Sequence, residues 1–251
     1  MSLSRNEAHR CGGPEGRPEG RPEGRAAAVV VAAGTGTRLG APVAKFLVDL
    51  AGKPLLFYAL RTLEGCLRLE EIVVVVPPGM EGEAEEKVIH PFSFKTVRGL
   101  VAGGPTRGDS VWAGLSLVSK GIRTVLIHDG ARPLVPEDLV VRVLDAADRL
   151  GAAVPGVESA DTLKRVEGDI TVATLDRSRI RRVQTPQGFH LSLLRKAYEE
   201  AIRAGDIATD DSTLVERAGA TVKLVPGSEL NFKITTPEDL ELAEAILATR
   251  E

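Results

Sequence analysis

The feature that most constrains the fold is a series of short apolar runs separated by amphipathic stretches. Residues 26–33 (AAAVVVAA) form a continuous apolar run, and similar runs recur at residues 71–76, 123–128 and 152–157. Runs of this length are typical of parallel strands that are buried on both faces. Helical patterns lie between and after them, at residues 55–66, 107–120, 136–150, 191–204, 210–218 and 237–249. This alternation predicts an α/β fold with three layers, α/β/α, around a mostly parallel, Rossmann-like sheet.

Two segments depart from this alternation. Residues 1–25 contain a Pro-Glu-Gly-Arg unit that occurs three times in succession. Such a tract has almost nothing apolar to bury, so it predicts a disordered extension ahead of one domain at residues 26–251. Residues 162–166 and 170–175 are short alternating segments around Gly168, which predicts an antiparallel hairpin. We place this hairpin in an inserted arm at about residues 160–186.

Composition argues against several classes of function. The net charge of −3 gives no overall attraction to nucleic acid. No apolar run approaches the roughly 20 residues that a membrane span needs, and the amino terminus lacks the apolar stretch of a secretory signal. Two cysteines and four histidines show no zinc-binding spacing, and such sparse cysteine suits a reducing compartment. We therefore expect a cytoplasmic protein with neither a membrane nor nucleic acid as its partner.

The loop after the first strand carries the strongest chemical signal. Gly34 and Gly36 let the backbone turn tightly, so that its amides can hold phosphate oxygens. Leu39 stands where a dinucleotide-binding fingerprint would need glycine, and the Gly-Lys-Ser/Thr of a phosphate-binding loop is absent. Arg38 and Lys45 add two cations, which with the amides are what a displacement at phosphorus requires. The alternative is a strand-to-helix turn with solvated charges.

Two further polar segments lie in loops that follow predicted strands. Ligands of open parallel sheets bind beyond the carboxyl ends of the strands, so these segments are candidates for the active site. Asp129 ends one predicted strand, where a carboxylate can hold Mg²⁺ together with substrate phosphates. The alternative is an ordinary turn with an ion pair between Asp129 and Arg132. Arg107 and Ser110 lie three residues apart at a helix start and so share one face. Taken alone, they indicate only a capped helix start.

The carboxyl-terminal half adds basic and hydroxyl groups. Four arginines between residues 177 and 182 are typical of a solvated face or of a site for a polyanion. Thr209 precedes a predicted helix, where hydroxyls and carboxylates commonly serve as caps. Thr236, followed three residues later by Asp239, is the signature of another helix start. The helix cap explains the presence of Thr236 and Asp239 but gives no reason for a lysine at position 233.

In combination these motifs resemble those of the nucleotidyltransferases that build activated sugars and polyols. Ala32-Ala33-Gly34-x-Gly36-x-Arg38 with a following lysine resembles the signature of that superfamily. Within it the chain is most similar to the 2-C-methyl-D-erythritol 4-phosphate cytidylyltransferases of the non-mevalonate isoprenoid pathway. Gly-Gly-x-x-Arg-x-x-Ser-Val from Gly103 and Thr-Pro-Gln from Thr185 also match the family, and matching segments span roughly residues 27–248. The family usually has Pro-Lys-Gln where this chain has Ala44-Lys45-Phe46.

The resemblance implies a nucleotidyltransferase fold and an enzyme that joins the cytidylyl group of CTP to 2-C-methyl-D-erythritol 4-phosphate, with Mg²⁺ as cofactor. Arg38 and Lys45 would be catalytic, and Asp129 would hold the metal. The implied CTP-binding residues are Ala32, Ala33, Gly34, Gly36, Gly104, Arg107 and Ser110. The implied residues for the polyol phosphate are Arg177, Lys233, Thr209, Thr185, Gly130 and Arg132. The resemblance also implies a homodimer, in which Arg177 reaches the substrate across the interface.

Three alternatives remain open from the sequence. Ribitol 5-phosphate cytidylyltransferases have closely similar motifs, so the polyol itself is not decided by them. A catalytically silent nucleotide-binding domain is a second alternative, although both loop cations and Asp129 argue against it. A nucleic-acid-binding function would rest only on the arginine cluster.

Overall fold

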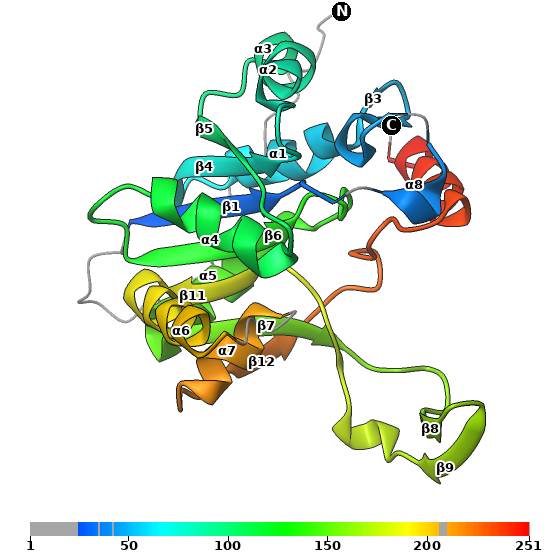
Figure 1. Cartoon of the computed structure of the whole chain (residues 1–251). Coiled ribbons are helices and arrows are strands. Elements are labelled where there is room, and N and C mark those ends of the chain that lie inside the picture. Colours follow the sequence, from blue (N-terminus) through cyan, green and yellow to red (C-terminus); the bar gives the residue numbers. More distant parts are fainter. Residues whose placement is uncertain (1–24, 35, 42, 206–209, 251) are drawn as a thin grey trace, which may run out of the picture.

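An eight-stranded sheet forms the centre of the molecule (Figure 1). The computed structural model describes residues 25–34, 36–41, 43–205 and 210–250. Strand β1 (Ala26–Val31) lies between β4 (Leu69–Val76) and β6 (Thr124–Asp129) and pairs in parallel with both. Strand β5 (Val97–Ala102) continues the parallel set beyond β4. The predicted mostly parallel α/β sheet is therefore confirmed.

The other half of the sheet mixes strand directions. Strand β11 (Gln187–His190) lies between β6 and β7 (Ala152–Val157) and is antiparallel to both. Strand β7 also pairs in parallel with β12 (Lys223–Pro226) and in antiparallel fashion with β10 (Arg182–Val183). The sequence analysis missed β5, β10 and β11. Strands of two to six residues that contain glycine or arginine form no continuous apolar run.

Helices cover both faces of the sheet, which confirms the three layers (Figure 1). Because successive side chains of a strand point to opposite faces, Ala28 and Val30 belong to one apolar cluster and Ala27 and Val29 to the other. The first cluster includes helices α1 (Leu55–Gly65) and α5 (Glu137–Leu150). The second includes α4 (Arg107–Leu117), α6 (Leu191–Ala204) and α7 (Asp211–Arg217).

A third, smaller cluster lies beside the glycine-rich loop. It joins Leu39 and Leu50 to Ala243 of helix α8 (Pro237–Ala248). Thr236 caps α8 by accepting a hydrogen bond from the Asp239 amide, as its sequence predicts. The remaining short elements are η1 (Thr37–Leu39), η2 (Lys45–Leu47), β2 (Asp49–Leu50), β3 (Lys53–Pro54), α2 (Glu81–Ala84), η3 (Glu85–Ile89), α3 (His90–Phe92) and η4 (Arg177–Arg179).

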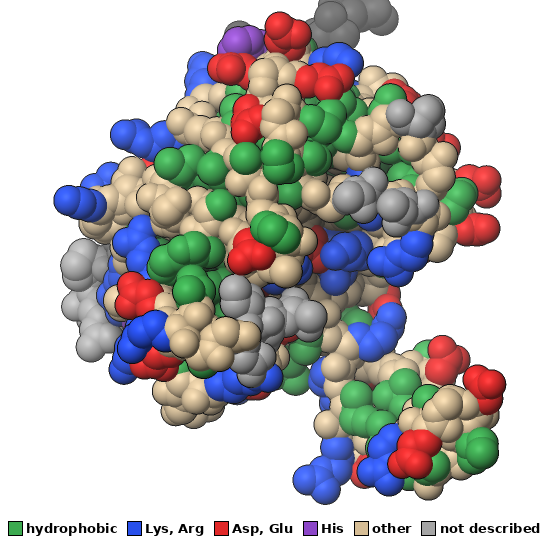
Figure 2. Space-filling view, viewed as in Figure 1, with side chains coloured by type: hydrophobic (Ala, Val, Ile, Leu, Met, Phe, Trp, Pro, Cys, Tyr) green, Lys and Arg blue, Asp and Glu red, His purple; other side chains and the backbone are tan. Residues whose placement is uncertain are grey.

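The predicted hairpin is present and projects from the body of the molecule as an arm (Figures 1 and 2). It consists of β8 (Lys164–Glu167) and β9 (Ile170–Thr174), joined through Gly168 at a φ of 58°. The chain rejoins the sheet at β10, so the arm is shorter than the expected residues 160–186. Gln184 and Thr185 are already buried in the body.

The Pro-Glu-Gly-Arg extension lies outside the described residues except for its last one, Arg25. That residue already contacts the domain, since its guanidinium pairs with Glu70 and its carbonyl accepts a hydrogen bond from the Arg123 amide. In the part of the chain that the structure describes, no helix has the length and apolar character to cross a membrane.

Candidate active site

A cavity of about 310 Å³ opens at the carboxyl ends of β1 and β6. It lies where ligands of open α/β sheets are expected. Segments far apart in the sequence meet there: the loop after β1, the start of α4, the end of β6 and the stretch before α8. Ten of the predicted site residues line it: Ala32, Ala33, Gly34, Lys45, Gly104, Arg107, Ser110, Asp129, Gly130 and Lys233.

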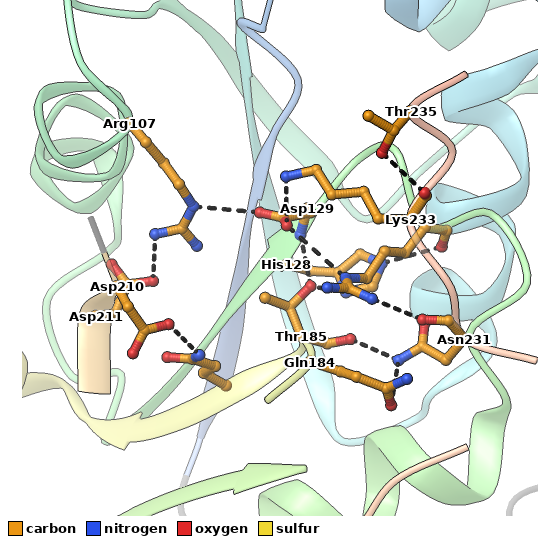
Figure 3. Close-up of polar contacts among 12 residues, drawn as sticks. Arg107, His128, Asp129, Gln184, Thr185, Asp210, Asp211, Asn231, Lys233 and Thr235 are labelled. Carbon is orange, nitrogen blue, oxygen red and sulfur yellow. Dashed lines mark hydrogen bonds and ion pairs between the residues drawn. The ribbon is translucent and has the colours of Figure 1, made fainter. Parts of the chain in front are cut away.

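Asp129 is the one carboxylate among the described residues that line the cavity. Its Oδ2 lies 2.9 Å from Nζ of Lys233 and 3.8 Å from Nε of Arg132, and its Oδ1 lies 3.3 Å from Nε of Arg107 (Figure 3). Burial alone would raise the pKa of this carboxyl, but Arg107, Lys233 and Arg132 together hold it well below its usual range. Asp129 is therefore ionised at neutral pH.

Arg107 connects Asp129 to a second, fully buried carboxylate. Its Nη1 lies 2.8 Å from Oδ2 of Asp211, the first residue of α7. Burial by itself would lower the pKa of this guanidinium, yet Asp211 and Asp129 raise it above its ordinary value. The predicted CTP-binding arginine is thus held between two acidic groups, one at the cavity and one behind it.

Lys45 enters the cavity beside the glycine-rich loop. A Cβ on Gly36 would lie only 2.8 Å from Cβ of Lys45, and Gly36 has a φ of 66°, so glycine permits both the turn and the close approach of the lysine. Gly36 itself does not line the cavity. Burial, and then the positive charges of Lys233 and Arg38, lower the pKa of Lys45. Arg38, the other predicted catalytic residue, is exposed and does not line the cavity.

The predicted base-binding segment forms a tight turn before α4. The Gly104 amide donates to Oγ of Ser110 at 3.2 Å, and that hydroxyl donates to the Thr106 carbonyl at 3.0 Å. A Cβ on Gly103 would lie 2.4 Å from Cβ of Ala33, so glycine lets this turn close against the loop after β1. Thr106 caps the helix in a capping box with Asp109. The capped helix start and the cavity wall are therefore the same structure.

A buried layer supports Asp129 from behind. The hydroxyl of Thr185 accepts a hydrogen bond from the Asp129 amide at 2.9 Å and lies 3.2 Å from Nδ1 of His128 (Figure 3). Nε2 of His128 faces the carbonyl oxygen of Arg132, which can only accept, so a neutral imidazole carries its proton on Nε2 and its Nδ1 accepts from the Thr185 hydroxyl. Burial is the main cause that lowers the pKa of His128 to about 4. Arg132 donates to the Asn231 carbonyl at 2.7 Å. Polyol binding by Thr185 and Arg132 stays a prediction.

Two predicted substrate residues lie elsewhere. Arg177 is exposed on the arm, where its guanidinium donates to the Ala160 carbonyl, and it does not line the cavity of its own chain. Thr209 lies outside the described residues. The expected side-chain cap of α7 is not formed by Asp210, and Gln187 instead accepts the Ser212 amide at 3.2 Å.

Comparison with known proteins decides the family. A model of the 2-C-methyl-D-erythritol 4-phosphate cytidylyltransferase family matches residues 26–249. The chain belongs to this family. It is 45% identical over 223 residues, 89% of this chain and 97% of the relative, to the 2-C-methyl-D-erythritol 4-phosphate cytidylyltransferase of Geobacillus thermodenitrificans. The cytidylyltransferase of the same name from Syntrophus aciditrophicus is 43% identical, over 89% of this chain and 96% of that relative.

Solved structures of cytidylyltransferases share the fold. A 4-diphosphocytidyl-2C-methyl-D-erythritol synthase from Anaerococcus prevotii superposes with a TM-score of 0.80 at 30% identity, covering 90% of this chain and 97% of that one. The 2-C-methyl-D-erythritol 4-phosphate cytidylyltransferase of Thermus thermophilus superposes with a TM-score of 0.73 at 39% identity, covering 88% and 98%. The predicted nucleotidyltransferase fold is confirmed, and the protein is a nucleotidyltransferase enzyme.

Two members of this cytidylyltransferase site escaped the sequence analysis. Asp211 was interpreted only as part of a helix start, and Tyr198 was not considered. The Tyr198 hydroxyl donates to Oδ1 of Asp211 at 2.6 Å, and the two side chains are almost fully buried. A carboxylate on the buried face of a short helix was the available signal, because an unpaired buried charge is costly and predicts a basic partner.

The donor set of the cytidylyltransferase site fits a magnesium ion that is held mainly by substrate. The described residues contain no cluster of three or more His, Cys, Asp or Glu side chains able to hold a metal. Asp129 offers one ionised carboxylate at the cavity wall. Mg²⁺ commonly binds through one or two carboxylates, with phosphates and waters as its other ligands.

Proposed function

We propose that this protein transfers the cytidylyl group of CTP to 2-C-methyl-D-erythritol 4-phosphate, giving 4-diphosphocytidyl-2-C-methyl-D-erythritol and pyrophosphate. The observation that carries the proposal is the gathering of Lys45, Arg107 and Lys233 around one cavity whose wall is the glycine-rich loop. Membership of the cytidylyltransferase family supplies the identity of the two substrates.

The reaction is a direct in-line displacement without a covalent enzyme intermediate. An oxygen of the polyol phosphate attacks the α-phosphorus of CTP, the bond to the β-phosphate oxygen breaks, and pyrophosphate leaves with the electron pair. A phosphate monoester carries a charge of about −1.5 to −2 at neutral pH and needs no general base. The burial and low pKa of His128, about 4, agree with the lack of such a role.

Catalysis then consists of positioning and of stabilising negative charge. Arg38 and Lys45 stabilise the pentacoordinate phosphorus, and the wall at Gly104 and Ser110 reads the cytosine edge. Lys233 holds the attacking phosphate. Mg²⁺, bound through Asp129 and the triphosphate, would neutralise charge on the departing pyrophosphate.

A homodimer would complete the site, since Arg177 lies on the arm and not at the cavity of its own chain. Five apolar side chains on or next to the arm are solvent-exposed in the single chain: Val166, Ile170, Val172, Leu175 and Val183. Such a patch suits burial against a second copy. A cytoplasmic location suits the buried, unpaired Cys66.

A pyrophosphate-release assay tests the function. The protein is incubated with CTP and Mg²⁺ and with either 2-C-methyl-D-erythritol 4-phosphate or ribitol 5-phosphate. Turnover with the first substrate at least a hundredfold above the second is expected. A reversed preference would assign the ribitol activity, and CTP binding without turnover on either would indicate a silent nucleotide-binding domain.

A further inference from the structure

A chain of buried polar contacts leads from the helical layer to the cavity. Trp112 of α4 stacks on Tyr198 of α6, with ring centroids 5.9 Å apart and planes 22° apart. Tyr198 donates to Asp211 at 2.6 Å, Asp211 pairs with Arg107 at 2.8 Å, and Arg107 reaches Asp129 at 3.3 Å. Three helices and the end of β6 thus converge on one guanidinium.

Stability alone is a poor reason for this arrangement. Removing a carboxylate and a guanidinium from water costs several kcal/mol per ion, which their attraction only about repays. Asp211 is 0% exposed, and burial raises the pKa of its carboxyl, although Arg107 and Tyr198 oppose that rise. Oδ1 of Asp211 accepts from Tyr198, and Oδ2 forms an ion pair with Arg107. The same guanidinium also contacts Asp129 (Figure 3). We therefore infer that the desolvation cost of burying this ion pair serves to hold Arg107 in a single orientation.

We propose that Asp211 and Tyr198 are positioning residues for cytidylyl transfer. They fix Arg107 so that its Nε holds Oδ1 of Asp129, which leaves Oδ2 directed at Lys233, 2.9 Å away. Neither Asp211 nor Tyr198 lines the cavity, so they act only through Arg107. The inference rests on the proposed function, because Lys233 and Asp129 are its substrate and metal residues.

A double-mutant cycle with Asp211→Asn and Arg107→Lys tests this. Asp211→Asn should lower kcat/KM for the polyol phosphate about tenfold or more, as expected for a lost contact between charged groups. The Kd of CTP, measured without polyol, should rise as well, because Arg107 lines the cavity and is itself one of the predicted CTP-binding residues. The double variant should lie within about twofold of Arg107→Lys alone, because both changes break one linkage. Additive losses would overturn the proposal.

Tyr198→Phe keeps the ring and removes only the hydrogen bond to Asp211, so it serves if Asp211→Asn does not fold. It should lower kcat/KM about threefold to tenfold with little change in Tm. The matched control is Asp148→Asn, which removes a partly buried carboxylate that is bound by Arg68 and by the hydroxyl of Thr124. Thr124 is the first residue of β6 and Asp129 the last. The control should have a lower Tm and an unchanged kcat/KM. A Tyr198→Phe enzyme with a lower Tm and an unchanged kcat/KM would overturn the positioning role.

A readout without substrate separates this inference from the proposed function. The Nε–H proton of Arg107 should exchange slowly with water in the free wild-type enzyme and much faster in Tyr198→Phe, as seen by nitrogen-15 NMR. Unchanged exchange would overturn the inference. Lack of turnover by the wild type would instead refute the proposed function and leave the exchange result to decide the positioning.

Discussion

At the scale of single residues, the cleft concentrates positive charge around one carboxylate. Lys45, Arg107 and Lys233 face the cavity, while Asp129 alone opposes them among the described lining residues. An excess of cations is what a triphosphate and a second phosphate would neutralise on binding. Burial, and then the positive charges of Lys233 and Arg38, lower the pKa of Lys45 in this cluster.

Arg38→Ala should lower kcat by about a thousandfold or more, by analogy with arginines that stabilise a transferred phosphoryl group. The side chain is exposed beside the cavity, so the free energy of unfolding should hardly change. Steady-state kinetics and urea unfolding measure the two quantities. A loss of kcat below tenfold would remove Arg38 from the active centre.

Lys45 should set an alkaline limit to activity. Burial and neighbouring cations lower its pKa, so raising the pH removes its proton sooner than from an ordinary lysine, and kcat/KM should fall with it. Lys45→Arg keeps its charge at every accessible pH. The variant should be slower at neutral pH, and its alkaline limb should lie at higher pH than that of the wild type. Superimposable limbs in the two pH profiles would assign the limit to another group.

His128 should make the protein sensitive to acid. In the unfolded chain its imidazole takes up a proton near pH 6.5, while in the folded protein its pKa is about 4. The unfolded state binds more protons between these values, so the free energy of unfolding should fall as the pH drops through this window, by roughly 3 kcal/mol. Urea unfolding of His128→Gln at pH 7 and pH 4.5 should show a smaller loss than the wild type. An equal loss would contradict the prediction.

At the scale of secondary-structure elements, the arm differs from the rest of the molecule. Its two strands pair only with each other, as β2 and β3 also do, but Leu50 of β2 is buried in the body whereas almost every residue of β8 and β9 is exposed. A lone two-stranded hairpin is only marginally stable in water. The arm therefore needs a covering surface more than any other element does.

Ile170→Glu should convert the proposed dimer to a monomer. The side chain is 71% exposed on β9, so a charge there costs little in the isolated chain but would be buried on association. Sedimentation velocity measures the change. Leu67→Glu is the control, because Leu67 is 74% exposed in a turn of the body and should leave the dimer intact. Equal sedimentation of both variants and the wild type would argue against an arm-mediated dimer.

At the scale of the whole molecule, the sheet brings together groups that no local segment contains. Asp129 and Lys233 are 104 residues apart in the chain and 2.9 Å apart in space. Arg177 is the exception, because the arm carries it outside the cavity of its own chain. A complete site therefore requires two chains if this arginine binds the polyol phosphate.

Mixing two inactive variants tests the shared site. Arg177→Ala lacks the arm arginine, and Lys45→Ala lacks the cavity lysine. In a heterodimer one of the two sites would combine an intact cavity with an intact arm, so a random mixture should recover roughly a quarter of the wild-type activity. No recovery after exchange of subunits would place Arg177 in the site of its own chain or outside catalysis.

The sequence by itself determined what depends on neighbours in the chain. Apolar runs predicted β1, β4, β6 and β7, because a strand buried on both faces leaves no polar alternation. Thr236 with Asp239 predicted the start of α8, and Gly168 the hairpin, since both depend on contacts within a few residues. The resemblance to the family, whose motifs occur in the same order along this chain, predicted ten of the residues that line the cavity.

Only the tertiary structure decided which distant groups meet. The short antiparallel strand β11 between β6 and β7 is stabilised by its two neighbours and has no apolar run of its own. Arg107 pairs with Asp211, 104 residues later, and Thr185 turns its hydroxyl to His128. Such pairings are determined by packing of the whole sheet and its helices, because the cost of burying a polar group is recovered only where a partner from another element arrives.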